Sequence, residues 1–349
     1  MPQLTWPTIL SGLVERQDLS PEAVAWAMNE ILSGNATSVQ MAGFMVALRA
    51  KGETVDEIRG LADAMRAHAT PINLDTEAVD VVGSGGDRAN TVNISTMAAI
   101  VTAASGRRVV KHGNRAASSM SGTADCLEAL GVVLDVPPDL QRHVFDEVGI
   151  AFLFAPLYHP SLRHAGPARK ELGIPTTFNV LGPLTNPAHP TAQAIGIADA
   201  RLAPVVAGVV AARGDRGMVF HGDDGLDELT TTTTSDVWLI RQGRTVADEI
   251  DPSAVGVQPA APEDLVGGSP EHNAAVVREV LSGAAGPVRD IVRLNAAAAM
   301  LAFDGPDLTV PVTEQLATRY VEAGRVIDSG ASSELLDRWI AATQRVMRP

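Results

Sequence analysis

The sequence predicts an α/β protein with a small, mainly helical domain and a larger domain built on a mostly parallel central sheet. Two observations lead to this fold class. The first seventy residues read as consecutive helices with short links, and from residue 79 onward short apolar runs alternate with helical sequence. Such alternation is typical of parallel strands joined by crossover helices. A chain of 349 residues is long enough to hold both parts.

Caps and stops mark the N-terminal helices. The stretch "LSPEAVAWAMNEILSG" offers Ser20 as an N-cap, a proline at the first helical position and a glycine at the end. Thr37 precedes the next helical stretch in the same way. In "TVDEIRGLADAMRAHA", Thr54 and Glu57 have the spacing of a capping box. We therefore expect three helices, followed by a linker at "TPINLD".

The larger domain follows from the alternation of strands and helices. We expect strands in "VDVVG", "RRVVKHG", "AIGIAD" and "RGMVFHG". We expect helices in "STMAAIVTAASG", "GTADCLEALGV", "RLAPVVAGVVAARG", "VRDIVRLNAAAAMLAFDG" and "SSELLDRWIAATQRVM". The five threonines at 230–234 are β-branched, so we interpret them as a strand near a sheet edge.

Composition limits the partners of the chain. The net charge of −14 gives an acidic surface, which repels nucleic acid and anionic membranes, so we expect neither as a partner. The N-terminus lacks the pattern of a signal peptide, and no run of about 18 apolar residues occurs, so we expect a cytoplasmic protein. The single cysteine, Cys126, excludes an intrachain disulfide and reads as a small core residue.

A glycine loop follows the first predicted strand. The residues "GSGGD", Gly83 to Asp87, stand between that strand and helical sequence, where backbone N–H groups can surround a phosphate. The alternative is a tight turn that needs positive φ. The loop is no Walker A motif, and Arg88 replaces the third glycine of a dinucleotide fingerprint. The short polar side chains of "NTVNIST" favour the anion site, with Ser95 as a helix cap.

The stretch "VVKHGNRAASSMSG" concentrates positive charge in an acidic chain. Lys111 follows a β-branched run, so it should emerge where a strand ends, at the edge where open α/β sheets bind ligands. The glycine loop emerges at the same edge. Together, the N–H-rich loop and Lys111, Asn114 and Arg115 suit a small, highly phosphorylated molecule. A solvated basic loop is the alternative, but it does not explain the hydroxyl groups of Ser118 and Ser119.

The stretch "HGDDGLDELT" holds four carboxylates within six residues. We assign Asp223 and Asp224 to a glycine-flanked turn. Asp227 and Glu228 are the metal candidates, because Mg²⁺ binds carboxylates together with substrate phosphates. A solvated turn is the alternative for the whole run.

The stretch "FAPLYHPSLRHAGPARKELGIPTTFNVLGPLTNPAHP" is a long segment dense in proline and glycine. A connection of this length inside a compact domain usually has a function. It carries Arg163 and Arg169, and arginine recognises planar carboxylates with a two-pronged fork. We therefore expect an acidic second substrate here, with an ordinary surface connection as the alternative. His159 and His164, taken singly, read as structural.

These segments, in this order, resemble the anthranilate phosphoribosyltransferases of tryptophan biosynthesis, and especially their actinobacterial members. The matching segments span residues 79–234, with a weaker match in "VRDIVRLNAAAAMLAFDG". The resemblance implies a helical domain at 1–76 with an excursion at about 160–185, and an α/β domain at 77–159 and 186–349. It also implies a hinge, a homodimer through the helical domain, and a Mg²⁺-dependent transfer from 5-phosphoribosyl 1-pyrophosphate to anthranilate, with two metal ions per subunit.

The resemblance also implies a set of site residues. It assigns the phosphoribosyl donor to Gly83, Gly86, Asp87, Thr91, Asn93, Ile94, Ser95, Thr96, Lys111, His112, Gly113, Asn114, Arg115, Ala116, Ala117, Ser118, Ser119 and Thr123. It assigns anthranilate to Gly83, Asn114, His159 and Arg169, and the metals to Ser95, Asp227 and Glu228. Lys111 reads as an anion clamp, and no residue is assigned as a general acid or base.

The sequence departs from the common family pattern at two positions, and three other functions are alternatives. Ser84 stands where threonine is usual, and Tyr158 where many members have a second histidine.

A pyrimidine nucleoside phosphorylase has a related fold, but "KHGNRAASS" and "DGLDE" favour a pyrophosphate donor with metal. A nucleic-acid-binding relative needs a basic groove, which the charge of −14 opposes. A transferase with another aromatic acceptor is the alternative closest to the expected function.

Overall fold

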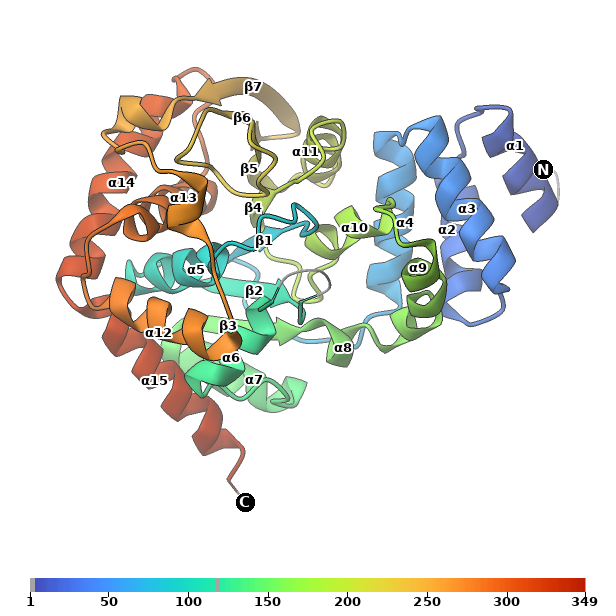
Figure 1. Cartoon of the computed structure of the whole chain (residues 1–349). Coiled ribbons are helices and arrows are strands. Elements are labelled where there is room, and N and C mark those ends of the chain that lie inside the picture. Colours follow the sequence, from blue (N-terminus) through green and yellow to red (C-terminus); the bar gives the residue numbers. More distant parts are fainter. Residues whose placement is uncertain (1–3, 117–119, 349) are drawn as a thin grey trace.

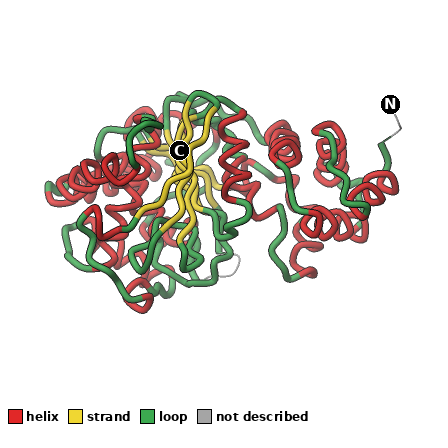
Figure 2. The backbone as a smooth tube through the Cα atoms, turned by 90° about the horizontal axis from the view of Figure 1, so that it is seen from above, coloured by secondary structure: helices red, strands yellow, loops and turns green. Residues whose placement is uncertain are grey.

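The computed structural model describes residues 4–116 and 120–348, and it confirms the two-part α/β architecture (Figures 1 and 2). The strands are β1 (Val79–Gly83), β2 (Val109–Gly113), β3 (Ile150–Phe154), β4 (Ala192–Gly196), β5 (Arg216–Gly222), β6 (Ser235–Arg241) and β7 (Arg244–Ile250). The helices are α1 (Trp6–Val14), α2 (Pro21–Leu32), α3 (Ser38–Lys51), α4 (Val55–Ala67), α5 (Ile94–Ala104), α6 (Thr123–Leu130), α7 (Pro138–Val148), α8 (Ala155–Tyr158), α9 (Gly166–Leu172), α10 (Phe178–Leu181), α11 (Ala203–Ala212), α12 (Pro270–Leu281), α13 (Pro287–Asp304), α14 (Val312–Asp328) and α15 (Ala331–Val346).

The N-terminal part is a helical layer with the caps that its sequence predicts. Ser20 caps α2, and Thr37 and Thr54 form capping boxes at the starts of α3 and α4. The described part of this layer also contains α1, a helix beyond the three expected from the sequence, which starts behind the N-cap Thr5. Later in the chain, α9 returns to this layer and packs on α3 (Figure 1), and its Ala168 is buried in the same core.

The sheet has the strand order β3-β2-β1-β4-β5-β6-β7. Its first five strands are parallel, and β6 and β7 add an antiparallel edge. The expected mostly parallel sheet is therefore confirmed. The chain leaves β1 and moves outward through β2 and β3 on one side, and later through β4 and β5 on the other. The carboxyl ends of β1 and its two neighbours consequently meet at one edge, where open α/β sheets place their ligands.

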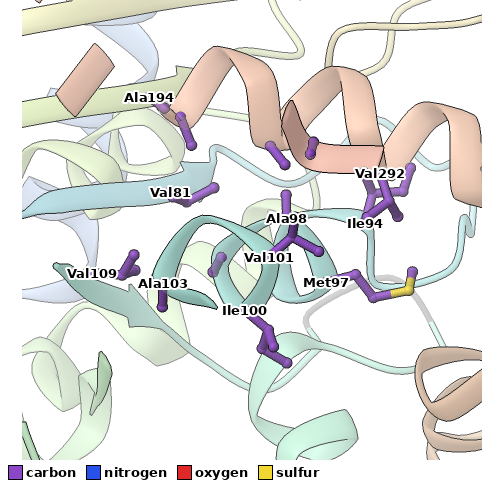
Figure 3. Close-up of a cluster of buried hydrophobic side chains, with 14 of the residues drawn as sticks. Val81, Ile94, Met97, Ala98, Ile100, Val101, Ala103, Val109, Ala194 and Val292 are labelled. Atoms are coloured by element: carbon purple, nitrogen blue, oxygen red, sulfur yellow. The ribbon is translucent and has the colours of Figure 1, made fainter. Parts of the chain in front are cut away.

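Alternation along the strands separates two cores. Val79 and Val81 of β1 face a core with α5 and α13, where Ile94 and Val292 also pack (Figure 3). Val82 faces the opposite core, with α11 and the helical layer. Since side chains alternate between the faces of a strand, this pattern leaves Asp80 on the same face as Val82. The apolar surface removed from water on both faces stabilises the sheet and fixes its register.

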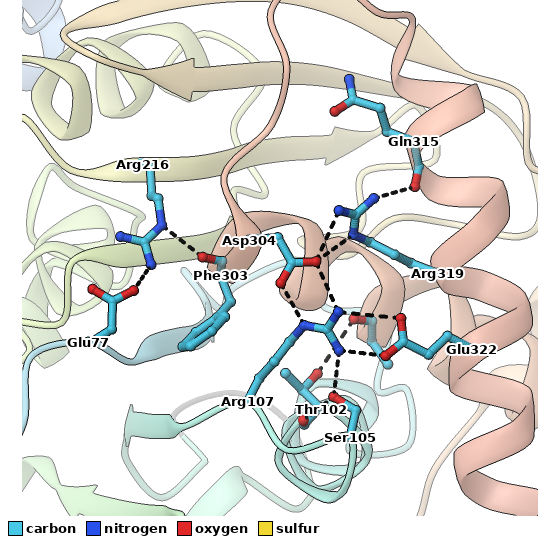
Figure 4. A network of polar contacts seen from close by, with 11 residues as sticks. Glu77, Thr102, Ser105, Arg107, Arg216, Phe303, Asp304, Gln315, Arg319 and Glu322 are labelled. Atoms are coloured by element: carbon cyan, nitrogen blue, oxygen red, sulfur yellow. Dashed lines mark hydrogen bonds and ion pairs between the residues drawn. The ribbon is translucent and has the colours of Figure 1, made fainter.

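A network of ion pairs fastens the edge of the sheet opposite the glycine loop (Figure 4). Arg107, just before β2, donates to Asp304 at the end of α13 and to Glu322 of α14. Arg216, at the start of β5, bonds Glu77 and the carbonyl of Phe303. These contacts connect the beginnings of three strands to α13 and α14, so this edge is braced while the other edge is left for the loops.

One expected strand is absent from the described structure, and one further finding concerns membranes. Thr230–Thr234 form a loop, and β6 begins only at Ser235, because the threonine hydroxyls bond the carboxylates of Asp223 and Asp224 instead of pairing in a sheet. None of the helices in the described residues has the length and apolar character needed to span a membrane.

Candidate active site

The glycine loop makes a tight turn directly after β1. Gly85 and Gly86 have φ values of 69° and 88°, so the expected need for positive φ is met by residues without a Cβ. The N–H of Gly85 donates to Oδ2 of Asp227 at 2.6 Å. A Cβ on Gly83 would lie 2.9 Å from the carboxyl carbon of Asp227, which is closer than packed atoms approach. The loop is thus shaped around the acidic segment as well as around a turn.

The start of α5 faces the same place. The N-cap is Asn93, whose side chain accepts from Asn273 at 2.8 Å, and the expected cap, Ser95, lies one residue inside the helix. The expectation of Ser95 as the cap is therefore wrong. Because it lies in the first turn, Ser95 can donate its backbone N–H to the carboxylate of Glu228 while its hydroxyl accepts from Lys111 at 3.1 Å.

Lys111 lies at the centre of the site. Its side chain is 2% exposed, and Nζ donates to the carbonyl of Val81 and to Ser95. Burial lowers the pKa of Lys111, while the negative charges of Asp80, Glu228 and Asp227 act in the opposite direction. A buried cation with two protein acceptors and carboxylates around it is a fixed positive group, not a solvated loop side chain.

Side chains bridge β1 and β2 beyond their registered pair, Val79 and Val109. The buried carboxylate of Asp80 accepts from the N–H of His112 at 3.1 Å and from Nδ2 of Asn186 at 2.8 Å. Burial, opposed chiefly by the bond from Asn186, raises the pKa of Asp80 to about 6. The bridge holds the ends of β1 and β2 in a defined position below the two loops that follow them.

The acidic segment supplies two carboxylates to this centre. Burial, with the nearby charge of Asp87, raises the pKa of Asp227 to about 7. Burial and the charge of Asp227 raise the pKa of Glu228 well above its ordinary value. Acidic groups crowded in this way favour a divalent cation, so Asp227, Glu228 and the hydroxyl of Ser95 fit a Mg²⁺ site chemically. The described residues hold no group of three or more His, Cys, Asp or Glu side chains arranged to bind a metal ion.

The other two carboxylates of the acidic run are exposed and belong to the turn, as the sequence predicts. Asp224 accepts from the hydroxyls of Thr230 and Thr232, and Asp223 accepts from that of Thr234. These bonds close the loop that follows the metal candidates.

The loop after β2 is held chiefly by contacts with α6. Arg115 donates to Asp125 and Glu128, each at 2.9 Å, so its charge is balanced by α6. The carbonyl of Asn114 accepts from Ala124, next to Thr123 at the start of α6. The N–H of Ala116 donates to Asp125. Gly113 lies against Phe152, where a Cβ would be 2.8 Å from the ring. The predicted contacts Ala117, Ser118 and Ser119 lie outside the described residues.

Two histidines lie together beneath this loop. The rings of His112 and His159 are 5.2 Å apart, and both residues are buried. Nδ1 of His112 is 3.1 Å from the carbonyl of Gly182, and Nε2 of His159 is 2.8 Å from that of Thr185. A carbonyl only accepts, so each of these ring nitrogens carries a proton and donates. Burial and the neighbouring His159 lower the pKa of His112 to about 3, and burial lowers that of His159 to about 4.

Arg169 is available for an anion. It lies on α9, with its guanidinium 5.8 Å from the centre of the Phe178 ring, and it forms no ion pair or side-chain hydrogen bond with any described residue. Burial lowers its pKa. An arginine that is partly withdrawn from water without a carboxylate partner is suited to a substrate carboxylate. Arg163, the other arginine of this segment, is exposed.

Two family models and many known proteins match this chain. The α/β domain of a glycosyl transferase family matches residues 75–332, and the helical bundle domain of a glycosyl transferase family matches residues 7–69. The anthranilate phosphoribosyltransferase of Arthrobacter sp. (strain FB24) is 56% identical over 97% of this chain and 96% of its own. That of Thermobifida fusca (strain YX) is 54% identical, over 99% of this chain and 98% of its own.

The chain belongs to the anthranilate phosphoribosyltransferase family.

Solved structures of the family agree with the fold. The enzyme from Thermus thermophilus superimposes with a TM-score of 0.88 at 39% identity, covering 96% of this chain and 99% of that one. The enzyme from Saccharomyces cerevisiae in complex with PRPP and Mg superimposes with a TM-score of 0.87 at 27% identity, covering 97% of this chain and 98% of that one.

Three residues that the sequence analysis did not identify help to build this candidate site. Asp80 and Asn186 connect β1 to β2, and Asn295 of α13 bonds the backbone beside Glu228. Each had a signal in the sequence, namely a carboxylate or an amide inside an apolar or proline-rich run. That signal marks a buried polar group but does not reveal its partner.

His112 gives this family member an acid-sensitive stability. The native ring takes up a proton only near pH 3, whereas the unfolded chain binds it below about pH 6.5. Between these values the unfolded state holds more protons, so the free energy of unfolding falls as the pH drops through this window. From pH 7 to pH 5 the loss from this one ring is about 2 kcal/mol. In urea titrations, His112→Asn should remove that part of the loss, and the same change at the exposed His143 should not. Equal pH dependence in wild type and His112→Asn would contradict the assignment.

Proposed function

We propose that this chain transfers the 5-phosphoribosyl group of 5-phosphoribosyl 1-pyrophosphate to the amine of anthranilate, giving N-(5-phosphoribosyl)anthranilate and pyrophosphate. This is the second step of tryptophan biosynthesis from chorismate. One observation carries the proposal. Buried Lys111, the start of α5 and the carboxylates of Asp227 and Glu228 meet behind one glycine loop, in a chain that shares over half its residues with curated anthranilate phosphoribosyltransferases.

The donor site lies between the glycine loop, the start of α5 and the loop after β2. Gly86, Asp87 and residues 91–96 offer N–H groups and hydroxyls to phosphate oxygens, as helix N-termini do. Lys111 supplies the fixed positive charge. The ion pairs of Arg115 with α6 indicate that this arginine shapes the loop, so residues 112–116 and Thr123 would meet the donor chiefly through backbone groups.

Asp227, Glu228 and Ser95 would hold Mg²⁺, with two ions per subunit. When bound, Mg²⁺ supplies positive charge to the pyrophosphate as it leaves. The carboxylates carry raised pKa values in the chain itself, which is the condition that a bound cation relieves.

The reaction breaks the bond between ribose C1 and the pyrophosphate oxygen and forms a bond from C1 to the anthranilate nitrogen. The nitrogen, positively charged after the attack, then releases one proton to the solvent. Lys111 and the N–H-rich loop stabilise negative charge where it develops on the leaving group. An arylamine is unprotonated at neutral pH, so positioning is sufficient and no strong base is required. Neutral His112 and His159 fit this chemistry, because they add no positive charge beside the ribose ring.

Anthranilate would bind between Gly83, Asn114, His159 and Arg169, with its carboxylate on Arg169. The bond from His159 to the carbonyl of Thr185 gives this histidine a structural part in shaping that wall. Water has to be kept from C1 during transfer, and closure of the helical part over the sheet would do this. Arg49 of α3 forms an ion pair with Asp199, which follows β4. This contact joins the helical part to the sheet, and closure would pivot on it.

We also infer the larger organisation that the family implies. Residues 1–76, with 160–185, would form the helical domain, and 77–159 and 186–349 the α/β domain. The exposed large apolar side chains of the helical part include Val14 of α1 (76% exposed) and Val39 of α3 (81% exposed), which suits a homodimer through this part of a cytoplasmic enzyme. Sedimentation velocity at micromolar protein should give a dimer that Val39→Asp weakens, and a wild-type monomer would contradict this.

The function is tested by mixing the protein with anthranilate, the phosphoribosyl donor and Mg²⁺ while following anthranilate fluorescence. The signal should fall only when all three are present, and Asp227→Ala should abolish the change. Loss of one charge-assisted contact costs about 2 kcal/mol, so Arg169→Ala should raise the anthranilate KM about thirtyfold.

Two comparisons make the fluorescence assay specific. Arg163→Ala, an exposed arginine in the same segment, should leave the anthranilate KM unchanged. A folded protein that binds the donor but leaves anthranilate unchanged would overturn the proposed acceptor, and other aromatic acids and nucleosides would then be screened.

A further inference from the structure

Asn295 is a buried amide in the middle of α13. Its side chain bonds both backbone groups of one residue in another segment: the N–H of Leu229 donates to Oδ1 at 2.9 Å, and Nδ2 donates to the carbonyl of Leu229 at 2.9 Å. Nδ2 also donates to the carbonyl of Ile291, one turn earlier, at 2.9 Å. The amide therefore fixes the peptide groups on both sides of Leu229.

Packing alone does not account for an amide at this position. Asn295 is 2% exposed, and the residues that follow it, 296–302, are buried apolar side chains in the core between α5 and α13. Asparagine is a weaker helix former than the alanines around it, and a buried amide is costly unless its hydrogen bonds are made. The hydrogen bonds to Leu229 offset this cost.

Leu229 directly follows the two metal candidates. Its own side chain is fully buried, so this residue is held by its side chain and by both backbone groups. On the other side of the pair, Oδ2 of Asp227 accepts from Gly85, and the Asp227 carbonyl lies so close to Gly196 that a Cβ there would overlap it. The segment is thus anchored both before and after Glu228.

The same helix also locates the third metal candidate. α13 packs along α5, as Ile94 and Val292 show in Figure 3, and Ser95 lies in the first turn of α5. An anchor on α13 therefore holds the carboxylates relative to the helix that carries the serine hydroxyl and the N–H that Glu228 accepts.

We propose that Asn295 is a positioning residue, which sets the affinity for the metal by clamping Leu229 and so holding Asp227 and Glu228 at the start of α5. The proposal rests on the assignment of that pair as metal ligands. Residues that orient ligands without touching the metal typically contribute ten- to a hundredfold to metal affinity.

The test uses Asn295→Asp, which keeps the size of the side chain. Its oxygen in place of Nδ2 faces two carbonyls, those of Leu229 and Ile291, so the clamp is lost. Binding of Mn²⁺ alone to the full chain, followed by loss of the paramagnetic resonance signal of free Mn²⁺, should weaken about tenfold. The Mg²⁺ concentration for half-maximal activity should rise by a similar factor, while the anthranilate KM stays unchanged.

Thr102→Val is the matched control. Thr102 of α5 is also buried, and its hydroxyl donates to the carbonyl of Ala296 at 3.5 Å across the same pair of helices, so this bond does not involve Leu229. This variant loses a buried polar group at constant size, so it reports what general disturbance of the α5–α13 core does. Its Mn²⁺ affinity should remain that of the wild type.

Asn295→Ala provides a second route if the aspartate variant does not fold, because the space it leaves admits a water that can pair with Leu229. It should also bind Mn²⁺ about tenfold more weakly. A folded variant of either kind with wild-type Mn²⁺ affinity overturns the proposal. If Asp227→Ala leaves the Mn²⁺ affinity unchanged, the metal assignment itself fails, which is a different result from an intact site that does not respond to Asn295.

Discussion

Replacing Lys111 by methionine should lower kcat/KM for the phosphoribosyl donor about a thousandfold. The side chain is buried, and its Nζ is bonded to the Val81 carbonyl and to Ser95. Removing one preorganised group that stabilises the charge developing on a leaving group costs about 2.7–4 kcal/mol of transition-state stabilisation, and each 1.36 kcal/mol is a factor of ten in rate. Methionine keeps most of the length and the apolar character of the lysine stem, so the change falls chiefly on the charge and its hydrogen bonds.

Steady-state kinetics with varied donor at saturating anthranilate measure this effect. Lys170→Met is the control, because Lys170 lies on α9 and is exposed, and this variant should behave as the wild type. In Lys111→Met the pKa of Glu228 should rise further, because the positive charge of Lys111, which lowers that pKa in the wild type, is gone. A variant with donor kcat/KM within tenfold of the wild type would show that Lys111 is only a structural cation.

Lys111 and the carboxylates explain each other. A buried lysine is unstable without negative partners, and buried carboxylates are unstable without positive ones. Here Lys111 lies among three carboxyl groups, those of Asp80, Asp227 and Glu228. Burial raises the pKa values of all three in the chain by itself, and a metal bound together with pyrophosphate would favour the ionised forms of Asp227 and Glu228.

Local signals allowed most of the fold to be predicted from the sequence. Helix caps such as Thr37 and Thr54 bond to residues within the same four-residue stretch, and apolar runs such as "VDVVG" indicate buried strands. The sequence alone therefore predicted these helices and the parallel sheet. The edge location of Lys111 followed from the rule for strand ends. Its burial between Val81 and Ser95 did not, because this depends on a strand and a helix that meet only in the folded chain.

The parts that could not be predicted depend on distant partners. The threonine run has high strand propensity, but the aspartates before it offer competing acceptors, so it forms a loop. Asp80 reads as an oddity in a buried strand until Asn186, more than a hundred residues away, is seen to donate to it. The ion pairs of Arg115 could not be predicted either, because α6 supplies their partners, Asp125 and Glu128.

Replacing Gly83 by alanine should lower kcat/KM for the donor about a hundredfold while the protein stays folded. The family resemblance assigns Gly83 to both substrates, and the structure adds that this glycine lies against the side chain of Asp227. An alanine Cβ would lie 2.9 Å from Asp227 Cγ and nearer still to Oδ2, so the carboxylate has to turn and lose its bond from Gly85. The backbone of Asp227 cannot retreat, because it packs against Gly196. A displaced ligand weakens the metal site by up to about a hundredfold, and overpacking costs about 1–3 kcal/mol of stability.

A double-mutant cycle separates the clash from any other effect of the methyl group. In Asp227→Ala the colliding carboxyl atoms are gone, so adding Gly83→Ala should cost almost no further stability in thermal unfolding, and the two changes should not be additive. Gly12→Ala in α1, where a Cβ makes an ordinary 3.7 Å contact, is the control for a glycine replaced without collision, and its activity should match the wild type. If the losses of stability in the two variants add up, or if Gly83→Ala is fully active, the absence of a Cβ at residue 83 is not what allows Asp227 to take its position. If the losses of stability are non-additive and activity falls, Gly83 supports catalysis by leaving space for the carboxylate of Asp227. Gly85 and Gly86, which have positive φ, then form the turn and face the substrate.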